Sequence, residues 1–236
     1  GLVYVSVLVF AILNSTAALI IFPIFMSLCV WEFYSMRVSQ KTVLNKIGIL
    51  ILSLVVFAGV FAMRNDDEIL GFLAGFSSTI AILLSILLFF QPEKLAFKSN
   101  ALLALVYVAV PFSLVSIWQI NATLFNSSNL LMLLIVIWVN DSFAYIFGVS
   151  FGKHKLFPRI SPKKSWEGFV GGAATSVIIG LFAYKYHLVE GFEQIEFVIF
   201  ILIIILAATF GDLVQSKFKR EAGVKDSGKL IAGHGG

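Results

Sequence analysis

The sequence predicts an all-α, polytopic integral membrane protein with about seven to eight transmembrane helices. Of its 236 residues, 59% are hydrophobic and only 13% are charged, and the mean hydropathy is +0.98. This composition excludes a soluble domain of this size. The long apolar runs, such as residues 197–210, are apolar on every side. Strands of a membrane barrel would instead alternate apolar and polar residues, so we expect the spans to be helices.

Each expected span is an apolar run close to the length of about 20 residues that a helix needs to cross the hydrocarbon core. The chain opens with residues 2–35, which are too long for one upright helix and contain the polar triplet Asn14-Ser15-Thr16. One tilted span or two shorter segments would fit, and we favour two. Six further spans are expected at residues 45–62, 69–90, 99–118, 128–150, 166–186 and 196–215.

The basic residues fall in alternate connections between the spans. All but Arg64 and Lys185 of the 17 lysines and arginines lie in the connections 37–46, 94–98, 153–164 and 217–229. Short cytoplasmic loops accumulate Lys and Arg, so we expect these connections to face the cytoplasm. The protein would then lie in the cell (inner) membrane with its active site on the cytoplasmic side.

We expect the chain to comprise two regions. Residues 1–118 form the N-terminal transmembrane helices. Residues 119–236 form a C-terminal transmembrane catalytic region with basic cytoplasmic loops at 151–165 and 216–236. Such loops suit anionic lipid headgroups or nucleotides, although they could also serve only to fix the topology.

Apart from Glu196 at the first residue of its span, four acidic residues fall inside the expected spans, namely Glu32, Asp141, Glu167 and Asp212. A charge at the centre of a span costs about 2.5–3.5 kcal/mol on insertion scales, so each needs a partner or a purpose. All four would lie in the cytoplasmic half of the membrane, which predicts a polar cavity open to the cytoplasm. Glu32 can reach the membrane surface at its helix end, and we assign it a structural role.

Asp212 and Asp226 are the natural candidates for binding a metal. Acidic clusters without sulfur favour Mg²⁺, which binds one or two carboxylates together with substrate phosphate oxygens. Asp212 lies near the cytoplasmic end of its span, and Asp226 follows Lys225 in a polar segment that could fold back over the cavity. Asn140, beside the deepest acid Asp141, adds an amide that could orient a water, a ligand or a metal.

The basic loops offer groups that bind phosphate. Ser161 followed by Pro162 is typical of a helix start, and Lys163 and Lys164 would lie beside the free N–H groups of that helix. An ordinary helix cap with topology-fixing lysines is the alternative. In the second loop, we expect phosphates to be surrounded by Ser216, Lys219 and Arg220.

Two segments carry motifs that resemble a known family. One segment reads Ser216-x-Phe218-Lys219-Arg220, four residues, Lys225-Asp226-x-Gly228, then Gly233-His234-Gly235-Gly236. The other holds Asn140-Asp141, Ala144-Tyr145, Phe151-Gly152-Lys153, Ser161-Pro162-Lys163-Lys164 and Glu167-Gly168. Together they resemble the signature of phosphatidate cytidylyltransferases, also called CDP-diacylglycerol synthases, over residues 138–236. Ala232 stands where that family usually has proline. The family pattern continues after the glycine pair with a hydrophobic step, Asp-Arg and another Asp, and our functional expectation concerns the intact protein.

The resemblance implies transfer of CMP from CTP to phosphatidic acid in phospholipid biosynthesis, with release of pyrophosphate. It implies Mg²⁺ as the cofactor, with a second cation left open. The implied metal ligands are Asp212, Asp226 and Asp141, and Lys225 joins them in the implied catalytic set. The implied substrate-binding residues are Asn140, Lys153, Ser161, Lys163, Lys164, Glu167, Ser216, Lys219, Arg220, Gly233, His234, Gly235 and Gly236.

Two other activities remain open from the sequence. A CTP-dependent polyprenol or phytol kinase would transfer the terminal phosphoryl group to an alcohol. A secondary transporter would use Asp141 to bind a coupling ion, but the acids lie toward one face and we see no inverted repeat. The expected partners are CTP, phosphatidic acid and the lipid bilayer, with no nucleic acid, and a homodimer is left open.

Overall fold

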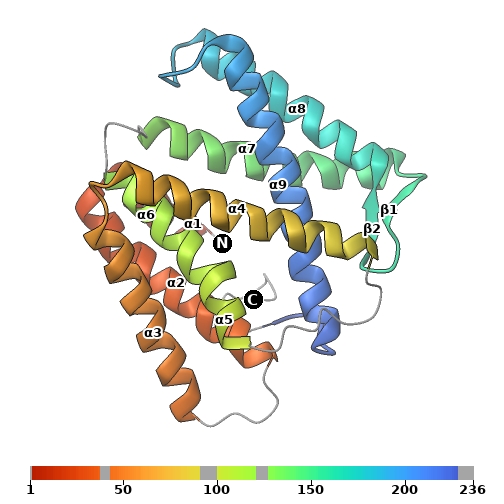
Figure 1. The fold of residues 1–236 in the computed structure, drawn as a ribbon. Helices are drawn as coiled ribbons and strands as arrows, with labels where there is room; N and C mark the ends of the chain where they lie inside the picture. The colour runs from red at the N-terminus through yellow and green to blue at the C-terminus, as the bar shows by residue number, and fades with distance from the viewer. Residues whose placement is uncertain (1, 38–42, 91–99, 121–126, 228–236) are drawn as a thin grey trace. The chain divides into compact units, whose positions relative to one another are not determined.

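The computed structural model describes residues 2–37, 43–90, 100–120 and 127–227 (Figure 1). Within them, seven helical stretches are long and apolar enough to cross a membrane, which confirms the predicted all-α, polytopic class. The elements are α1 (Leu2–Leu13), α2 (Ser15–Arg37), α3 (Val43–Ala62), α4 (Asp67–Phe90), α5 (Asn100–Ala104), the π-helix η1 (Leu105–Ala109), α6 (Val110–Ile120), α7 (Ser127–Phe151), β1 (Lys155–Phe157), β2 (Ser161–Ser165), α8 (Trp166–Lys185) and α9 (Gln194–Glu221).

Contacts divide the chain into two units. The first comprises Gly1–Phe125 with Phe218–Gly236, and the second comprises Asn126–Lys217. The boundary falls inside α9, so the last turn of this helix counts with the first unit.

The first unit opens with two helices, as predicted for residues 2–35. The break lies at Asn14, whose side-chain oxygen accepts a hydrogen bond from the backbone N–H of Ala17 at 3.0 Å. Asn14 thereby caps the start of α2. The helix α2 is long enough to cross the membrane, whereas α1 has only 12 residues.

The helices α3, α4 and α6 pack around a small apolar core in the first unit. Its buried residues are Val60, Leu70, Leu114 and Ile117. The start of α4 is fixed by Asp66, whose carboxylate accepts a hydrogen bond from the N–H of Ile69 at 3.0 Å. The predicted span at 99–118 is one helical stretch that passes through η1 between α5 and α6.

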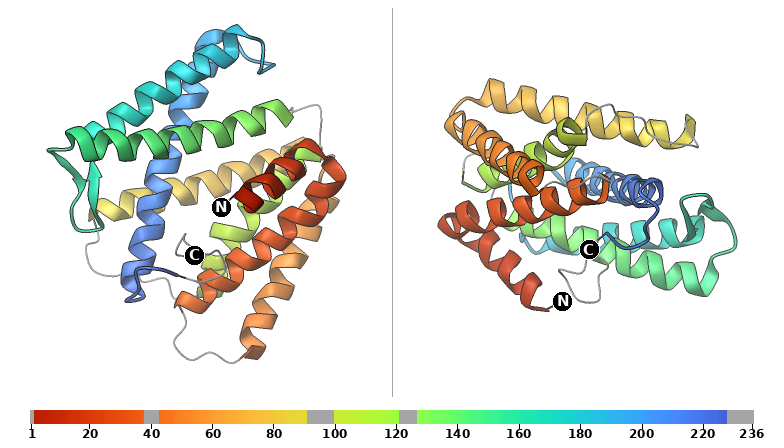
Figure 2. Two further views of the ribbon diagram at one scale, coloured as in Figure 1. Left: turned by 180° about the vertical axis from the view of Figure 1, so that it is seen from behind. Right: turned by 90° about the horizontal axis from the view of Figure 1, so that it is seen from below.

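In the second unit, glycines allow α7 and α8 to pack closely. A Cβ atom on Gly168 would lie 2.5 Å from the carbonyl oxygen of Ala144, and one on Gly172 would lie 2.7 Å from that of Asn140. No larger side chain fits at either position without moving a backbone, so these glycines serve helix packing. Both views in Figure 2 show α7 and α8 side by side.

The helix α9 completes the core of the second unit. Phe197 and Ile201 of α9 are fully buried in a cluster with Met132 and Val136 of α7. Gly180 of α8 faces this cluster, because a Cβ atom there would lie 2.1 Å from Ile201 Cδ1. The core therefore holds the membrane-spanning part of α9 against α7 and α8.

A two-stranded hairpin connects α7 to α8 in the second unit. The strands β1 and β2 are antiparallel, with Lys155 opposite Ser165 and Phe157 opposite Ser161. The register shifts between these two pairs, as in a β-bulge. The sequence did not predict this hairpin.

The prediction that a helix begins at Ser161-Pro162 is wrong. Both residues lie in β2, and α8 begins at Trp166. The N-cap is Ser165, whose hydroxyl accepts a hydrogen bond from the N–H of Gly168 at 3.2 Å. Pro162 is tolerated in β2 because a two-stranded hairpin has only edge strands, where a residue without an N–H need not break the pairing.

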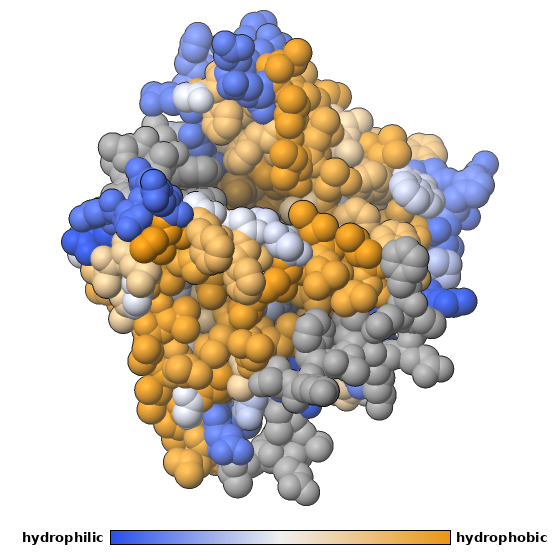
Figure 3. Space-filling view, in the orientation of Figure 1, coloured by the Kyte–Doolittle hydropathy of each residue, from blue (hydrophilic) through white to orange (hydrophobic). Residues whose placement is uncertain are grey.

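The surface suits a lipid environment. On the face seen in Figure 3, apolar residues cover the helices and polar residues gather near the helix ends. Large apolar side chains point outward on both units, including Phe72 with 71% exposure and Val149 with 70%. Such extensive apolar exposure is unusual for a soluble protein and normal for one surrounded by lipid.

Candidate functional site

Two predicted site residues form an ion pair in the second unit, and a third lies within electrostatic range of both. Lys164 of β2 places its Nζ 2.6 Å from Oδ2 of Asp212 on α9. Asp141 of α7 lies within electrostatic range of both of them. The structure therefore gathers two predicted metal ligands and one predicted phosphate-binding lysine. The polar cavity that the sequence predicts around them stays a prediction.

The Lys164–Asp212 ion pair is accessible to ligands. The Asp212 side chain is 54% exposed, and the Lys164 side chain is 29% exposed. Lys163, the preceding residue in β2, is exposed, and Ser161 is half-buried. The hairpin thus presents cationic groups beside the acids of α7 and α9.

Asn140 brings a buried hydrogen-bond acceptor next to Asp141. The residue is only 2% exposed, and its side-chain oxygen has no hydrogen-bond partner within the described part of the chain. A buried acceptor without a partner costs about 1–3 kcal/mol. Folded proteins tolerate few such groups outside functional sites, so Asn140 is a candidate for contacting a bound ligand.

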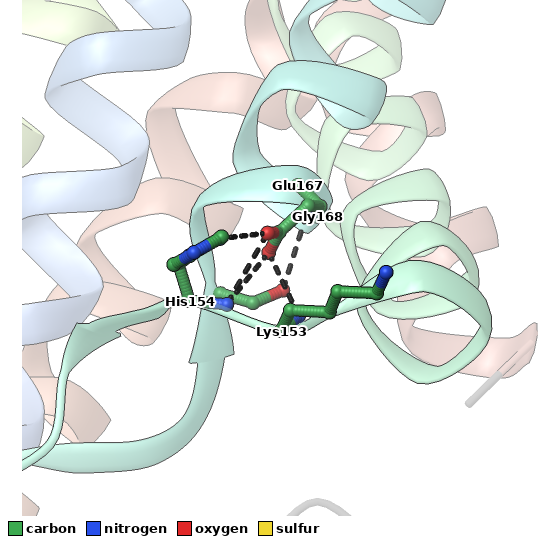
Figure 4. Close-up of polar contacts among 5 residues, drawn as sticks. Lys153, His154, Glu167 and Gly168 are labelled. Carbon is green, nitrogen blue, oxygen red and sulfur yellow. Dashed lines mark hydrogen bonds and ion pairs between the residues drawn. The ribbon is translucent and has the colours of Figure 1, made fainter.

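Glu167 fixes the chain segment that leads from α7 into the hairpin (Figure 4). Its carboxylate accepts hydrogen bonds from the backbone N–H groups of Lys153 at 3.1 Å and His154 at 3.2 Å. The His154 ring Nδ1 also lies 2.6 Å from the carboxylate. Glu167 thereby ties the end of α7 to the start of α8 and orients the hairpin between them. Its predicted contact with substrate stays a prediction.

Lys153 uses its backbone and its side chain differently. Its N–H donates to Glu167, whereas its side chain extends away from that carboxylate (Figure 4). The Lys153 ammonium group therefore points away from the Glu167 carboxylate. This arrangement is compatible with the predicted role of Lys153 in substrate binding.

The remaining candidates belong to α9 and the segment after it. Ser216 lies in the second unit and is half-buried, and Lys219 and Arg220 form the last turn of α9 in the first unit. Lys225 and Asp226 follow the helix and are exposed. The predicted pairing of Asp212 with Asp226 joins residues of different units, and it stays a prediction. The candidates Gly233, His234, Gly235 and Gly236 lie outside the described residues.

Two side chains with structural roles near the site were missed in the sequence. Ser165 is the true cap of α8, four residues after the serine that the motif suggested. Lys217 is only 4% exposed, and it interacts with other groups. The burial of Lys217 could not be predicted from the sequence, because a run of basic residues is typical of a solvent-exposed segment.

The donor set of the site fits a divalent metal. Within the described ranges, no three acidic, histidine or cysteine side chains form a metal-binding group. Mg²⁺ does not require three, because it typically takes one or two carboxylates and completes its shell with phosphate oxygens and water. Asp141 and Asp212 supply two such carboxylates.

Comparisons with known proteins give consistent matches. The family described as "Cytidylyltransferase family" matches residues 1–236. A phosphatidate cytidylyltransferase of Staphylococcus saprophyticus is 35% identical over 198 residues, which cover 82% of this chain and 71% of that protein. Proteins of the same name from Haemophilus influenzae and Staphylococcus aureus are 44% and 46% identical over 110 and 102 residues. These two matches cover 45% and 43% of this chain and 38% and 39% of the relatives.

Proposed function

This chain belongs to the cytidylyltransferase family, and on that premise we infer that it is a phosphatidate cytidylyltransferase. It transfers the cytidylyl group of CTP to phosphatidic acid, releases pyrophosphate and leaves CDP-diacylglycerol in the membrane. The reaction is a step of phospholipid biosynthesis.

The observation that carries this proposal is the ion pair between Lys164 of β2 and Asp212 of α9, with Asp141 of α7 within electrostatic range of both. The reaction must bring two polyanions, a lipid phosphate and a nucleoside triphosphate, into contact. Carboxylates that can hold a divalent cation and a lysine that can contact a phosphate are what this task requires. The location of Lys164 on a hairpin outside the long helices suits substrates with polar headgroups.

The reaction does not require a general base. A phosphate monoester has a second pKa of about 6, so phosphatidic acid is largely ionised at neutral pH. An oxygen of its phosphate forms a bond to the α-phosphorus of CTP. The bond from that phosphorus to the bridging oxygen breaks, and pyrophosphate leaves with the electron pair. The protein must therefore align the two phosphates and stabilise the negative charge that moves onto pyrophosphate.

Asp212 and Asp226, with Asp141 at a second position or in the outer shell, would hold Mg²⁺. When bound, the metal neutralises phosphate charge and stabilises the leaving group. The cationic residues would contact the phosphates of the two substrates, and these are Lys153, Lys163, Lys164, Lys219, Arg220 and Lys225.

We further propose that the site faces the cytoplasm in a cell membrane. The basic connections support this orientation through the positive-inside rule. CTP is made in the cytoplasm, so an enzyme that consumes it must open on that side.

An assay with the intact protein tests the proposed activity. Purified protein in lipid vesicles would be incubated with CTP, phosphatidic acid and Mg²⁺, and the products would be identified. CDP-diacylglycerol and pyrophosphate are the expected products. Formation of CDP from CTP and an alcohol acceptor would indicate a kinase, and solute uptake without CTP turnover would indicate a transporter.

Replacing Asp212 tests the metal role. Asp212→Asn keeps the size of the side chain but removes the charge that would bind Mg²⁺. We expect activity to fall by at least about 100-fold, because a metal supplies several kcal/mol and 1.36 kcal/mol is tenfold in rate. Thermal unfolding should stay close to that of the unchanged protein, because the side chain is 54% exposed. Full activity in this variant would contradict the metal role.

A further inference from the structure

The chain reverses direction immediately after α9, in the first unit. Gly223 has a positive φ of 73°, which L-residues with a side chain rarely adopt. The N–H of Gly223 donates to the carbonyl of Arg220 at 3.0 Å, and that of Val224 donates to Lys219 at 2.9 Å. This pair of bonds is a Schellman motif, which ends a helix and turns the chain. The segment 224–227 therefore leaves α9 in a defined direction.

The last turn of α9 is fixed to other elements of the first unit. Arg37 at the end of α2 pairs with Glu221 at 3.4 Å and donates to the side-chain oxygen of Asn100 at 3.0 Å. The Arg37 and Glu221 side chains are only 10% and 9% exposed. The Arg37 guanidinium also lies 4.8 Å from the ring centroid of Phe218. A buried ion pair restrains its two side chains more than an exposed pair does, so this pair helps to fix the last turn of α9 against α2.

Aromatic packing strengthens this attachment. Phe218 is fully buried, and its ring centroid lies 5.3 Å from that of Phe33 on α2 and 5.6 Å from that of Tyr107 in η1. Both contacts are edge-to-face, which is a favourable arrangement for aromatic rings. The helix end that precedes the turn is thus held by packing as well as by charge.

A hydrogen bond holds the other end of the segment. The Ser227 hydroxyl donates to the carboxylate of Glu32 on α2. Lys225 and Asp226 therefore lie between two attachments, the one around Arg37 and the one at Glu32. Both residues are exposed and available to ligands, although the chain on either side of them is fixed.

We propose that Glu32 and Ser227 are positioning residues that hold Asp226 in place for the metal. The inference rests on the proposed function, in which Asp226 is a metal ligand. A ligand on a segment of irregular structure must otherwise be ordered when the metal binds, which weakens binding. Residues that orient a metal ligand typically change metal affinity by about 10–100-fold when they are replaced. Glu32 therefore has a role in the reaction in addition to the structural role that its place in α2 suggests.

The test measures metal binding in the intact protein with Mn²⁺ as the probe, by electron paramagnetic resonance. Glu32→Ala and Ser227→Ala should each raise the Mn²⁺ dissociation constant by at least about 10-fold. The double variant should be no worse than either single one, because both remove the same bond. Glu32→Gln should bind Mn²⁺ nearly as well as the unchanged protein, since its amide oxygen can still accept from Ser227.

Ser35→Ala is the matched control. Ser35 lies one turn further along α2, and its buried hydroxyl has no hydrogen-bond partner among the described residues. Removing this hydroxyl should leave Mn²⁺ binding unchanged. Hydrogen exchange at residues 222–227 should accelerate in Glu32→Ala and Ser227→Ala but not in the control.

The kinetics separate positioning from a loss of folded protein. The Mg²⁺ concentration for half-maximal activity should rise in Glu32→Ala, and kcat at saturating Mg²⁺ should largely recover. Should Glu32→Ala fail to fold, Ser227→Ala, which loses the hydrogen bond, can be compared with Glu32→Gln, which keeps it. Unchanged Mn²⁺ affinity in folded Ser227→Ala would overturn the inference. Absence of CDP-diacylglycerol synthesis by the unchanged protein would instead refute the proposed function.

Discussion

Lys164 and Asp212 form an ion pair, although the proposed mechanism assigns them to different partners. Asp212 is assigned to the metal and Lys164 to a phosphate. In this pair the Lys164 ammonium group neutralises the Asp212 carboxylate. Binding of a divalent cation to Asp212 would then release the ammonium group for the substrate. On these proposed roles, the pair would link metal binding to the availability of a phosphate contact.

Lys164→Gln should separate these two effects. Without the competing ammonium, Mn²⁺ binding to the ligand-free protein should tighten, but by less than about 5-fold, because pairs this exposed contribute at most about 1 kcal/mol. Activity should fall by at least about tenfold, since a group that stabilises phosphate charge is lost. Titration with Mn²⁺ and the CDP-diacylglycerol assay measure the two quantities.

Lys163→Gln provides the control for this prediction, because Lys163 is the neighbouring, exposed lysine of the same strand. Its replacement should leave Mn²⁺ affinity unchanged. Weaker Mn²⁺ binding by Lys164→Gln would show that the lysine supports the metal site rather than competing with the metal.

Sequence reasoning singles out residues whose charge is costly in a membrane. Asp141 and Asp212 are examples, because a charge in an apolar span needs a partner. The structure pairs Asp212 with Lys164 and places Asp141 within electrostatic range of both, whereas their roles in catalysis stay predictions. The hydrogen bond between Ser227 and Glu32 was not predicted. It joins residues that are far apart in the chain, and a single serine gives no pattern from which such a contact could be found.

At the level of elements, the packing of α7 against α8 places the hairpin and its lysines. Glycine is required in this contact, since the Cβ of a larger residue at Gly168 would lie 2.5 Å from the Ala144 carbonyl oxygen. Gly168 is also the residue whose N–H is capped by Ser165. A change there would move the start of α8 together with the hairpin that precedes it.

Gly168→Ala should therefore destabilise the protein by about 1–3 kcal/mol, the usual cost of overpacking. Activity should fall as well, because the hairpin carries Lys163 and Lys164. Gly75→Ala in α4 is the matched control, since a Cβ there meets nothing within 4 Å and alanine is the better helix former. Denaturant unfolding in detergent measures both variants, and equal stability would contradict the proposed role of the close contact.

The long apolar helices could be predicted from the sequence, but the hairpin could not. Apolar runs identify spans directly, because each must satisfy its backbone internally within lipid. Ser161-Pro162 was mistaken for a helix cap because the local pattern allows that reading. The pairing of β2 with β1 and the attachment of Lys153 and His154 to Glu167 are tertiary contacts, which local patterns do not encode.

At the scale of the whole molecule, the distribution of charge predicts the orientation in the membrane. All but two of the 17 basic residues fall in alternate connections. The hairpin between α7 and α8 carries five of the basic positions, which are Lys153, Lys155, Arg159, Lys163 and Lys164. The connection between α8 and α9 instead carries Glu190 and Glu193. Consecutive connections of a polytopic protein lie on opposite sides of the membrane, so these two loops must differ in accessibility.

Cysteine labelling in intact cells tests this orientation. The single native cysteine, Cys29, would first be replaced by alanine. Lys155→Cys in the hairpin and Glu193→Cys in the α8–α9 connection, both at exposed positions, would then be treated with a membrane-impermeant maleimide. We expect labelling of the Glu193 position in intact cells, and labelling of the Lys155 position only after the membrane is opened, because basic loops stay in the cytoplasm. The reverse pattern would place the proposed site on the side without CTP, and would thereby contradict both the orientation and the access of the enzyme to its nucleotide.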